Sequence, residues 1–278
     1  MTIQELLTQL ESELEDNDEN PMIAHWVLQH YYGLNSNLEL IKLLANKATK
    51  IKYCFDAIKR YINGEPLARI LGKTQFYYQE FIVNDNVFCP RLETEILVDN
   101  VVKLCKSKTN LKILDLCCGT GVIGISLKLA LNKQTTIVSV ADINENAIKN
   151  AIINAQQHNC EIIAYHSNFF DNIPQQTFDV IVCNPPYIDV NEKIGINVEK
   201  FDPQNALFAN DNGILAYKEI IDNSKRYLNS KYLLAFEIGS NQAKVVSFLL
   251  KKMDPNLTIE IIQDYNKKDR VIIAKKDF

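Results

Sequence analysis

The 278-residue sequence lacks several features that would point to a particular class of protein. No apolar run approaches the length of a membrane-spanning helix. The amino terminus, Met1-Thr2-Ile3-Gln4-Glu5, has neither the basic start nor the apolar stretch of a signal peptide. The formal net charge is −4, so the basic excess of a duplex-binding protein is missing. We therefore expect a cytoplasmic protein with no membrane contact and no direct nucleic-acid partner.

Metal-binding and disulfide patterns are also missing. The seven cysteines form no C-x-x-C pair and no Cys/His cluster with zinc spacing. Several of them lie in apolar runs typical of strands, so we expect reduced core residues and no metal site. The four histidines are scattered, and none of them is assigned a catalytic role.

The first part of the chain is predicted to be helical. Thr2-Ile3-Gln4-Glu5 and Ser36-Asn37-Leu38-Glu39 each fit a capping box, which indicates the start of a helix. Further helices are expected at about 21–33 and 51–62. We expect Trp26, Tyr31 and Tyr32 to fill a small helical core, and the alternative is an aromatic face that binds a partner.

A short β segment is predicted to follow. Aromatic and β-branched residues at 74–83 and 87–89 flank the polar turn 84–86, which indicates a β-hairpin or a pair of short strands acting as a linker. Pro90-Arg91-Leu92-Glu93-Thr94-Glu95 then opens a helix.

From Leu111 onward, strand and helix patterns alternate. Such alternation predicts a mostly parallel sheet with helices on both faces. The predicted strands are 112–116, 137–141, 162–166, 178–183 and 232–238, the predicted helices include 144–158, 214–228 and 242–252, and 257–263 with 270–274 are expected to form a closing antiparallel pair.

A glycine-containing loop, Asp115-Leu116-Cys117-Cys118-Gly119-Thr120-Gly121, joins the first strand of this series to its helix. Glycine lets a backbone turn tightly and approach a ligand closely. Asp142 ends the second strand roughly 20 residues later, where a residue that binds a ribose is expected. The pattern fits two cofactors, a dinucleotide or S-adenosylmethionine.

Three observations favour S-adenosylmethionine. Asp115 comes just before the glycines, where its carboxylate could hold the cofactor's ammonium group, whereas it would not help a pyrophosphate. No later segment supplies a hydride-transfer site. A third motif, described next, follows the fourth strand at the same edge of the sheet. The alternative for Asp115 is an acid whose bonds are satisfied within the turn.

The third motif is Asn184-Pro185-Pro186-Tyr187, which follows the apolar run 178–183. The carboxyl end of a strand is where open α/β sheets bind ligands. The prolines fix φ and donate no backbone hydrogen bond, so the motif offers an amide oxygen, backbone carbonyls and an aromatic face. Such a set could hold a planar group with an NH2, and the alternative is a rigid turn.

Together these motifs resemble class I methyltransferases that methylate amide or amino nitrogens. Further stretches resemble the bacterial release-factor glutamine methyltransferases (the PrmC/HemK family), from about Glu65 to the end of the chain. These stretches are Glu65–Gly72, Phe76, Phe81–Val83, Pro90–Glu95, Asp202–Leu207, Gly213-Ile214, Glu237–Gly239 with Gln242, and Asp269-Arg270.

The resemblance implies an α/β fold, with a Rossmann-like seven-stranded class I methyltransferase domain at 91–278. It implies a small helical domain at 1–72 that binds the release factor, and a β-hairpin linker at 73–90. The implied reaction moves a methyl group from S-adenosylmethionine to the side-chain N5 of the glutamine in the Gly-Gly-Gln motif of class 1 peptide chain release factors. S-adenosylhomocysteine would be the product, no metal would be needed, and we expect a monomer. The alternatives are a DNA adenine-N6 methyltransferase, another protein-glutamine methyltransferase, or a binding module without activity.

The resemblance also assigns roles by position. Asn184, Pro185 and Tyr187 would be catalytic, and Asn184–Tyr187 including Pro186 would bind the glutamine. The chain departs from the family pattern at Cys117-Cys118, at Asn168-Phe169, at Leu92 and at Asp202. The cofactor-binding residues would be Asp115, Cys117, Cys118, Gly119, Thr120, Gly121, Asp142, Phe169 and Asn184.

Overall fold

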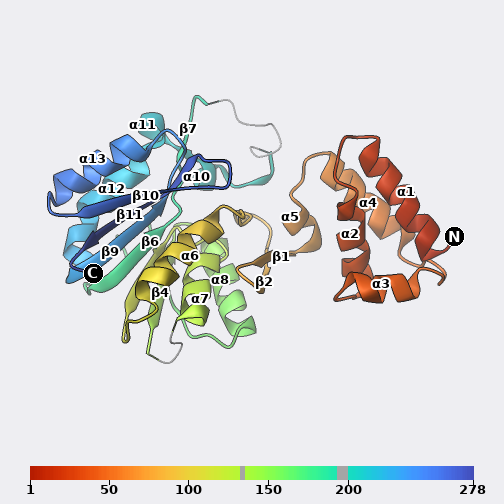
Figure 1. Ribbon diagram of the computed structural model, residues 1–278, viewed down its shortest axis with the longest axis horizontal. Coiled ribbons are helices and arrows are strands. Elements are labelled where there is room, and N and C mark those ends of the chain that lie inside the picture. Colours follow the sequence, from red (N-terminus) through yellow and green to blue (C-terminus); the bar gives the residue numbers. More distant parts are fainter. Residues whose placement is uncertain (132–134, 193–199) are drawn as a thin grey trace. The chain divides into compact units, whose positions relative to one another are not determined.

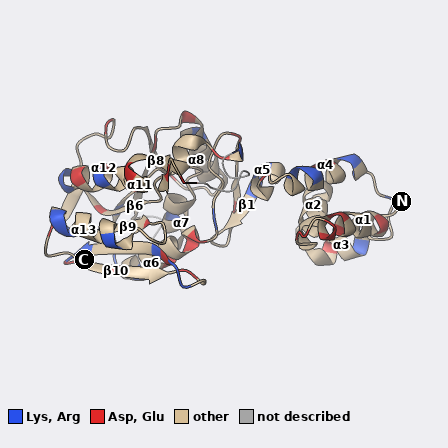
Figure 2. Ribbon diagram, turned by 90° about the horizontal axis from the view of Figure 1, so that it is seen from above, with Lys and Arg blue, Asp and Glu red and all other residues tan. Residues whose placement is uncertain are grey.

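The computed structural model describes residues 1–131, 135–192 and 200–278, and these form two compact units (Figure 1). One unit is built on Met1–Gly72 with residues 200–201, and the other on the described residues of 73–192 and 202–278. Basic and acidic residues are interspersed along the ribbons of both units (Figure 2). No described helix is both long and apolar enough to cross a membrane.

The first unit is helical, as the sequence predicts. Thr2 caps the first helix: its hydroxyl accepts from the Glu5 amide at 3.2 Å, and the Glu5 carboxylate accepts from the Thr2 amide at 2.8 Å. The second predicted box is only half formed, because the Glu39 carboxylate accepts from the Asn35 amide instead of the Ser36 amide. The helices are α1 (Ile3–Glu15), α2 (Met22–Tyr32), α3 (Asn37–Leu43), α4 (Ile51–Ile62) and α5 (Leu67–Leu71), the last of which the sequence did not predict.

Aliphatic residues fill the core of this unit. The buried side of α2 consists of Ile23, Ala24, Val27 and Leu28, and Trp26 falls outside that stripe. Trp26 is 45% exposed, so the prediction that it fills the core is wrong. Tyr31 and Tyr32 are partly buried and pack against the core.

A β-hairpin opens the second unit, but its turn is not where the sequence predicts it. β1 (Lys73–Phe76) pairs with β2 (Gln79–Ile82), and Phe76 lies opposite Gln79. The turn is therefore Tyr77-Tyr78, with φ values of 45° and 65°. A two-residue hairpin turn of this kind requires positive φ at both positions, which usually means Asn or Gly.

A turn does form at residues 85–86, and two asparagines of α8 (Glu145–Gln157) explain why no strands pair across it. The Ile82 amide donates to Asn154 at 2.7 Å, and the Asn84 amide donates to Asn150 at 2.8 Å. The two asparagine side chains thus take up the backbone N–H groups that would otherwise bond to a further strand. Residues 87–89 form no strand.

The larger unit contains, in the described part of the chain, a seven-stranded sheet with the order β10-β11-β9-β6-β3-β4-β5. The strands from β9 to β5 are parallel, and β11 is antiparallel to both of its neighbours. The predicted mostly parallel sheet and its closing antiparallel pair are thus confirmed. The strands are β3 (Lys112–Leu116), β4 (Ile137–Asp142), β5 (Ile163–His166), β6 (Phe178–Cys183), β9 (Leu228–Glu237), β10 (Thr258–Gln263) and β11 (Asp269–Lys276).

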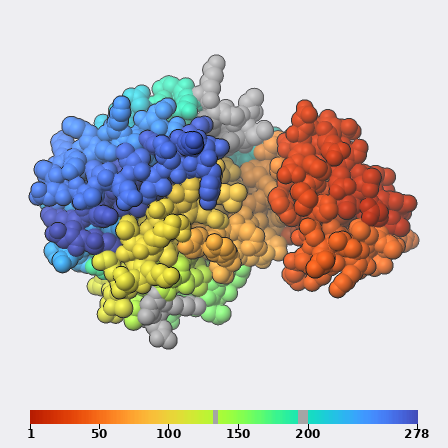
Figure 3. Space-filling view, in the orientation of Figure 1, coloured from red at the N-terminus to blue at the C-terminus, as the bar shows by residue number. Residues whose placement is uncertain are grey.

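Helices cover both faces of this sheet, since the strands bury alternate residues on opposite sides. Along β6, Val180 and Val182 join the core under α6 (Thr94–Cys105), α7 (Val122–Ala130) and α8. Ile181 and Cys183 join the core under α12 (Leu215–Ser224) and α13 (Ala243–Met253). In Figure 3, residues of α6 (yellow) lie directly against the C-terminal residues (blue). This three-layer α/β arrangement is the class I methyltransferase fold that the family resemblance implies.

Small elements beyond the sheet were not predicted. They are β7 (Ile188–Asp189), α10 (Gln204–Leu207), β8 (Phe208–Ala209), α11 (Asn210–Gly213) and the 3-10 turn Lys225–Tyr227. Because that turn ends the preceding helix early, β9 begins at Leu228 rather than at 232. The seven cysteines are free thiols, and all except the half-buried Cys117 are buried.

Strand register brings the predicted motifs to one edge of the sheet. Leu116 of β3 lies opposite Cys183 of β6 and Ala141 of β4. Cys183 in turn lies opposite Phe236 of β9. Because these strands are parallel, the residues that follow them share the carboxyl edge.

Candidate functional site

The glycine loop after β3 turns back sharply on itself. Cys117, Gly119 and Gly121 all have positive φ, of 56°, 54° and 81°. The Gly121 amide donates to the Cys118 carbonyl at 2.8 Å. A Cβ on Gly121 would lie 2.9 Å from Ala151 Cβ, so only glycine fits between this loop and α8. The loop therefore keeps its backbone close to the space beyond the strand ends.

Asp142 ties the end of β4 to this loop. Its Oδ2 accepts from the Gly119 amide at 2.9 Å, and its Oδ1 accepts from the Asn144 amide at 2.8 Å. Burial raises the pKa of Asp142, although the Asn144 and Gly119 amides oppose that shift. Each carboxylate oxygen keeps a second lone pair, which can accept a bond from a ligand hydroxyl.

Asp115 is fully buried and only half satisfied. Its Oδ2 accepts from the Gly124 amide at 2.9 Å, while its Oδ1 has no hydrogen-bond partner among the described residues. Burial raises the pKa of Asp115 to about 8. A buried oxygen without a partner is costly, so this carboxyl suits a ligand that brings a positive charge. The donors and acceptors of the loop thus fit the ammonium and ribose of S-adenosylmethionine.

The Asn184–Tyr187 motif follows β6 and is held from several sides. The Asn184 amide group donates to the Thr94 hydroxyl at 3.3 Å, and the Tyr187 hydroxyl donates to Glu237 at 3.4 Å. Gln242 donates to the Tyr187 carbonyl at 2.8 Å. These bonds fix the position of the Asn184–Tyr187 segment, here named the substrate corner, whose backbone the two prolines make rigid.

The substrate corner leaves no room for a side chain at position 213, so this residue has to be glycine. Gly213 has φ 75°, and a Cβ there would lie 2.1 Å from the Tyr187 carbonyl oxygen. Any side chain would push the backbone of Tyr187 out of place. The Gly213-Ile214 stretch, which resembled the family, therefore has a steric reason in the fold.

Glu237 and Thr94 lie within stretches that resemble the family, and the sequence predicts no role for either. Glu237 is the last residue of β9, and its Oε2 lies 2.6 Å from Thr94 Oγ1 at the start of α6. Burial raises the pKa of Glu237, against the opposing Thr94 hydrogen bond and Arg270 charge. The signal that could have found Glu237 is an acid at the end of an apolar strand, as at Asp115 and Asp142.

The structure thus gathers most of the predicted site residues on the ends of adjacent strands. The glycine loop, Asp142 and the Asn184–Tyr187 motif share the carboxyl edge. Phe169 follows β5 with φ 43°, and it packs against the same core as Cys117 and Tyr187. Its contact with an adenine ring stays a prediction.

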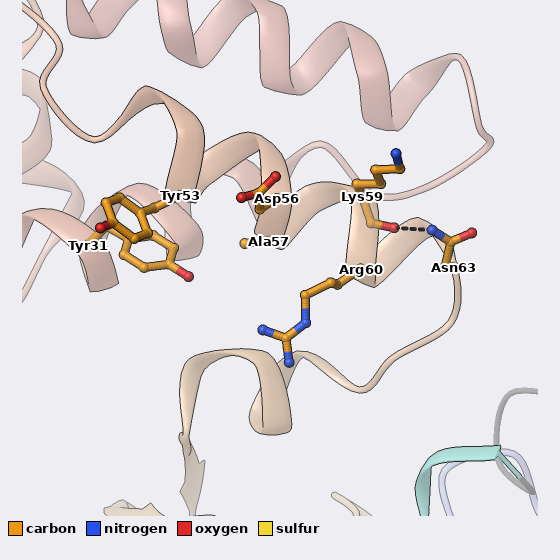
Figure 4. Close-up of a pocket in the computed structure, with 7 residues that line it drawn as sticks. All are labelled: Tyr31, Tyr53, Asp56, Ala57, Lys59, Arg60 and Asn63. Carbon is orange, nitrogen blue, oxygen red and sulfur yellow. Dashed lines mark hydrogen bonds between the residues drawn. The ribbon is translucent and has the colours of Figure 1, made fainter.

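A separate pocket lies on the helical unit (Figure 4). The Tyr31 and Tyr53 ring centroids are 5.8 Å apart, and the Asn63 amide group donates to the Lys59 carbonyl at 2.8 Å. Arg60 pairs with Glu65 through a 2.7 Å bond from its Nε. The pocket is lined by Tyr31, Tyr53, Asp56, Ala57, Lys59, Arg60 and Asn63, so it is no part of the strand-edge site.

Known proteins match both the sequence and the fold. Residues 80–216 match the family model described as Methyltransferase small domain. A bifunctional methyltransferase of Rickettsia bellii is 38% identical, over 91% of this chain and 51% of that protein. A release factor glutamine methyltransferase of Mycoplasma mycoides subsp. mycoides is 34% identical, over 91% of this chain and 90% of that protein. A 16S rRNA methyltransferase of T. thermophilus, solved with AdoMet and guanosine, aligns with a TM-score of 0.53 at 15% identity, over 73% of this chain and 49% of that one.

The chain spans about half the length of the Rickettsia bifunctional methyltransferases. It matches the Mycoplasma enzyme over nearly the whole of both chains. The structural alignment supports the fold alone. On the sequence match and the strand-edge site together, the chain belongs to the release factor glutamine methyltransferase family.

Proposed function

We propose that this chain transfers a methyl group from S-adenosylmethionine to the side-chain N5 of the glutamine in the Gly-Gly-Gln motif of a class 1 peptide chain release factor. The observation that carries the proposal is the position of Asn184–Tyr187 beside the Asp115–Gly121 loop, at the ends of the paired strands β6 and β3. A methyl donor and an NH2 acceptor can meet there. The names of the relatives support the choice of substrate.

The cofactor would be held by the residues that the loop and β4 bring together. Bound there, S-adenosylmethionine supplies an electrophilic methyl group on a sulfonium and leaves as S-adenosylhomocysteine. Asp115 Oδ1 would accept from its ammonium group, and Asp142 would accept from its ribose hydroxyls. Phe169 would lie near the adenine. The backbone of Cys117–Gly121 would lie against the remaining part of the cofactor.

The substrate amide would be gripped by acceptors. An amide nitrogen is a poor nucleophile because its lone pair is delocalised, and attack requires it to become pyramidal. The Asn184 Oδ1 and the Pro185 carbonyl would accept its two N–H bonds. Acceptors placed for the pyramidal nitrogen stabilise the transition state more than the planar ground state. Tyr187 would stack on the amide plane, and the extra proton is lost to water afterwards, so the chain supplies no general base.

The helical unit would dock the protein substrate. Under this proposal residues 1–72 bind the release factor, 73–90 act as a linker and 91–278 carry out the transfer in the cytoplasm. Tyr53, 58% exposed, and the pocket beside it offer an aromatic and charged surface that supports this role. Aromatic and arginine side chains dominate the binding energy of many protein interfaces.

Transfer of labelled methyl groups tests the function. The acceptors are a release factor, its Gly-Gly-Gln→Gly-Gly-Ala variant, and a DNA duplex that contains adenine. We expect label in the unaltered factor alone. Label in both factors would mean a different protein site, label in DNA would support the adenine reaction, and label in none would contradict methyl transfer.

A further inference from the structure

A buried hydroxyl connects the substrate-binding asparagine to a carboxylate. Thr94 is 2% exposed and lies in the first turn of α6. Its Oγ1 is 2.6 Å from Glu237 Oε2 and 3.3 Å from Asn184 Nδ2. The three residues come from α6, the end of β9 and the end of β6. Nothing in the proposed chemistry uses Thr94 or Glu237 directly.

The number of protons available on Glu237, Thr94 and Asn184 decides which group donates in each of the two hydrogen bonds. A threonine hydroxyl has a single proton, and a carboxylate can only accept. A separation of 2.6 Å between Thr94 and Glu237 is that of a hydroxyl donating to a charged acceptor, so the Thr94 proton lies between them. The Thr94 oxygen can then only accept from Asn184. The Asn184 group that faces Thr94 must therefore be its NH2.

We propose that Thr94 and Glu237 are positioning residues that hold the Asn184 side chain with its Oδ1 as the acceptor for the substrate amide. The inference rests on the proposed function, because it assumes an NH2 as the group to be gripped. A side chain rotated by half a turn would present its own NH2 to the substrate NH2. Two donors facing each other cannot bond, so this rotation would remove the grip.

Two hydroxyl groups and a guanidinium favour the ionised form of Glu237, against burial, which is the largest effect and raises its pKa. The Tyr187 hydroxyl donates to its other oxygen at 3.4 Å, so one acid orients two residues of the substrate corner. The Arg270 charge acts in the same direction, while burial and Glu93 act against it. Arg270 is fixed in turn, since its Nη2 bonds Asp264 at 3.2 Å. The Glu237–Gly239 and Asp269-Arg270 stretches thereby acquire a role.

Variants of Thr94 separate positioning from a merely structural role. Thr94→Val keeps the shape and removes the hydroxyl, whereas Thr94→Ser keeps the hydroxyl. Thr136→Val, an equally buried threonine before β4 at the opposite edge of the sheet, is the matched control. We expect Thr94→Val to lower kcat about 10- to 100-fold, with KM for the release factor and Kd for S-adenosylmethionine changed less than about twofold. Thr94→Ser should restore most of kcat, and Thr136→Val should leave it unchanged.

A double-mutant cycle with Asn184→Ala gives the sharpest result. If Thr94 acts through Asn184, adding Thr94→Val to Asn184→Ala lowers the residual rate no further. An equal loss in both backgrounds would overturn the inference. So would wild-type kcat in Thr94→Val. If Thr94→Val does not fold, Glu237→Gln takes its place, because its NH2 can donate to Thr94 and release the hydroxyl proton toward Asn184.

A spectroscopic readout keeps the inference apart from the proposed function. The side-chain NH2 signals of Asn184 in a ¹H–¹⁵N spectrum, assigned by their absence in Asn184→Ala, should shift in Thr94→Val and in Glu237→Gln. They should stay in place in Thr136→Val. Unshifted signals would overturn the inference even if the wild-type protein transfers methyl groups. Shifted signals together with an inactive wild-type protein would overturn the proposed function and leave the positioning role intact.

Discussion

The Gly119 amide donates to Asp142 Oδ2 across 2.9 Å, which ties the cofactor loop after β3 to the acid that ends β4. The same carboxylate accepts from the Asn144 amide through its other oxygen. One side chain therefore sets both the shape of the loop and the acceptors that a ribose would meet. Loop geometry and cofactor affinity should respond together to changes at this residue.

Asp142→Asn tests that link. The asparagine side chain keeps one acceptor oxygen and has an NH2 in place of the other. This NH2 faces a backbone N–H, and two donors cannot form a hydrogen bond. We expect the affinity for S-adenosylmethionine to fall about 10- to 100-fold, the loss of one hydrogen bond to a charged group. Titration calorimetry measures the affinity, and Asp222→Asn, an exposed acid on α12, is the control. Equal affinities in Asp142→Asn and the wild type would contradict the assignment.

Asp115 should make stability depend on pH. Its pKa is raised by burial from 3.8 to about 8. Between these two pH values the folded state keeps the Asp115 proton, whereas the unfolded state has lost it. The stability that this group contributes is therefore present below about pH 4 and is lost as pH rises toward 8, by up to about 1.4 kcal/mol per pH unit. Asp115→Asn removes this dependence.

Urea unfolding at several pH values measures the effect. The free energy of unfolding of Asp115→Asn, relative to the wild type, should increase between about pH 5 and about pH 8. The Asp222→Asn control should show no such trend. Because Asn cannot accept a charge-assisted bond from an ammonium, the same variant should also bind S-adenosylmethionine more weakly. A constant difference across the pH range would show that Asp115 titrates normally.

The sequence predicted the elements whose signals are local. β3, β6 and α4 begin and end where their patterns say, because burial periodicity and caps act within a few residues. The turn at Tyr77-Tyr78 carries no such signal, since its positive φ values are stabilised from elsewhere: the Tyr77 amide donates to Glu95 at 2.8 Å. The exposure of Trp26 likewise depends on how α2 packs.

The sequence predicted where the candidate site lies, but it did not predict the hydrogen bonds between its residues. Glycines, acids and Asn184–Tyr187 at successive strand ends indicate a shared edge. The partner of Glu237 is Thr94, 143 residues away, and no spacing rule connects them. The bond from Gln242 to the Tyr187 carbonyl also joins residues far apart in sequence, with 55 positions between their numbers. Such pairs become visible only after the strands are ordered.

Gly213→Ala should disturb the substrate corner. Its Cβ would lie 2.1 Å from the Tyr187 carbonyl oxygen, whereas a Cβ on Gly33, which also has positive φ, would meet nothing within 4 Å. Gly33→Ala should therefore cost about 1 to 2 kcal/mol from its backbone conformation alone. Gly213→Ala should cost about 1 to 3 kcal/mol more, and it should also lower kcat. Equal losses in urea unfolding would show that Gly213 does not control Tyr187.

Tyr53→Ala tests docking on the helical unit. Its ring is 58% exposed beside the pocket of Figure 4, so we expect KM for an intact release factor to rise about 5- to 10-fold with kcat unchanged. The rate with a short Gly-Gly-Gln peptide should stay the same. Tyr265→Ala, 94% exposed between β10 and β11, should leave both substrates unaffected. An unchanged KM in Tyr53→Ala, or an equal rise in Tyr265→Ala, would contradict docking through this pocket.

The position of the transferred methyl group tests the central claim most directly. Tandem mass spectrometry of the Gly-Gly-Gln peptide, cut from a release factor after reaction with S-adenosylmethionine, locates that group. We predict one methyl group on the side-chain amide nitrogen of the glutamine with the wild-type protein. Asn184→Ala, which should keep most of its cofactor affinity, should give little or none. A methyl group on any other residue, or equal product from Asn184→Ala, would contradict the account.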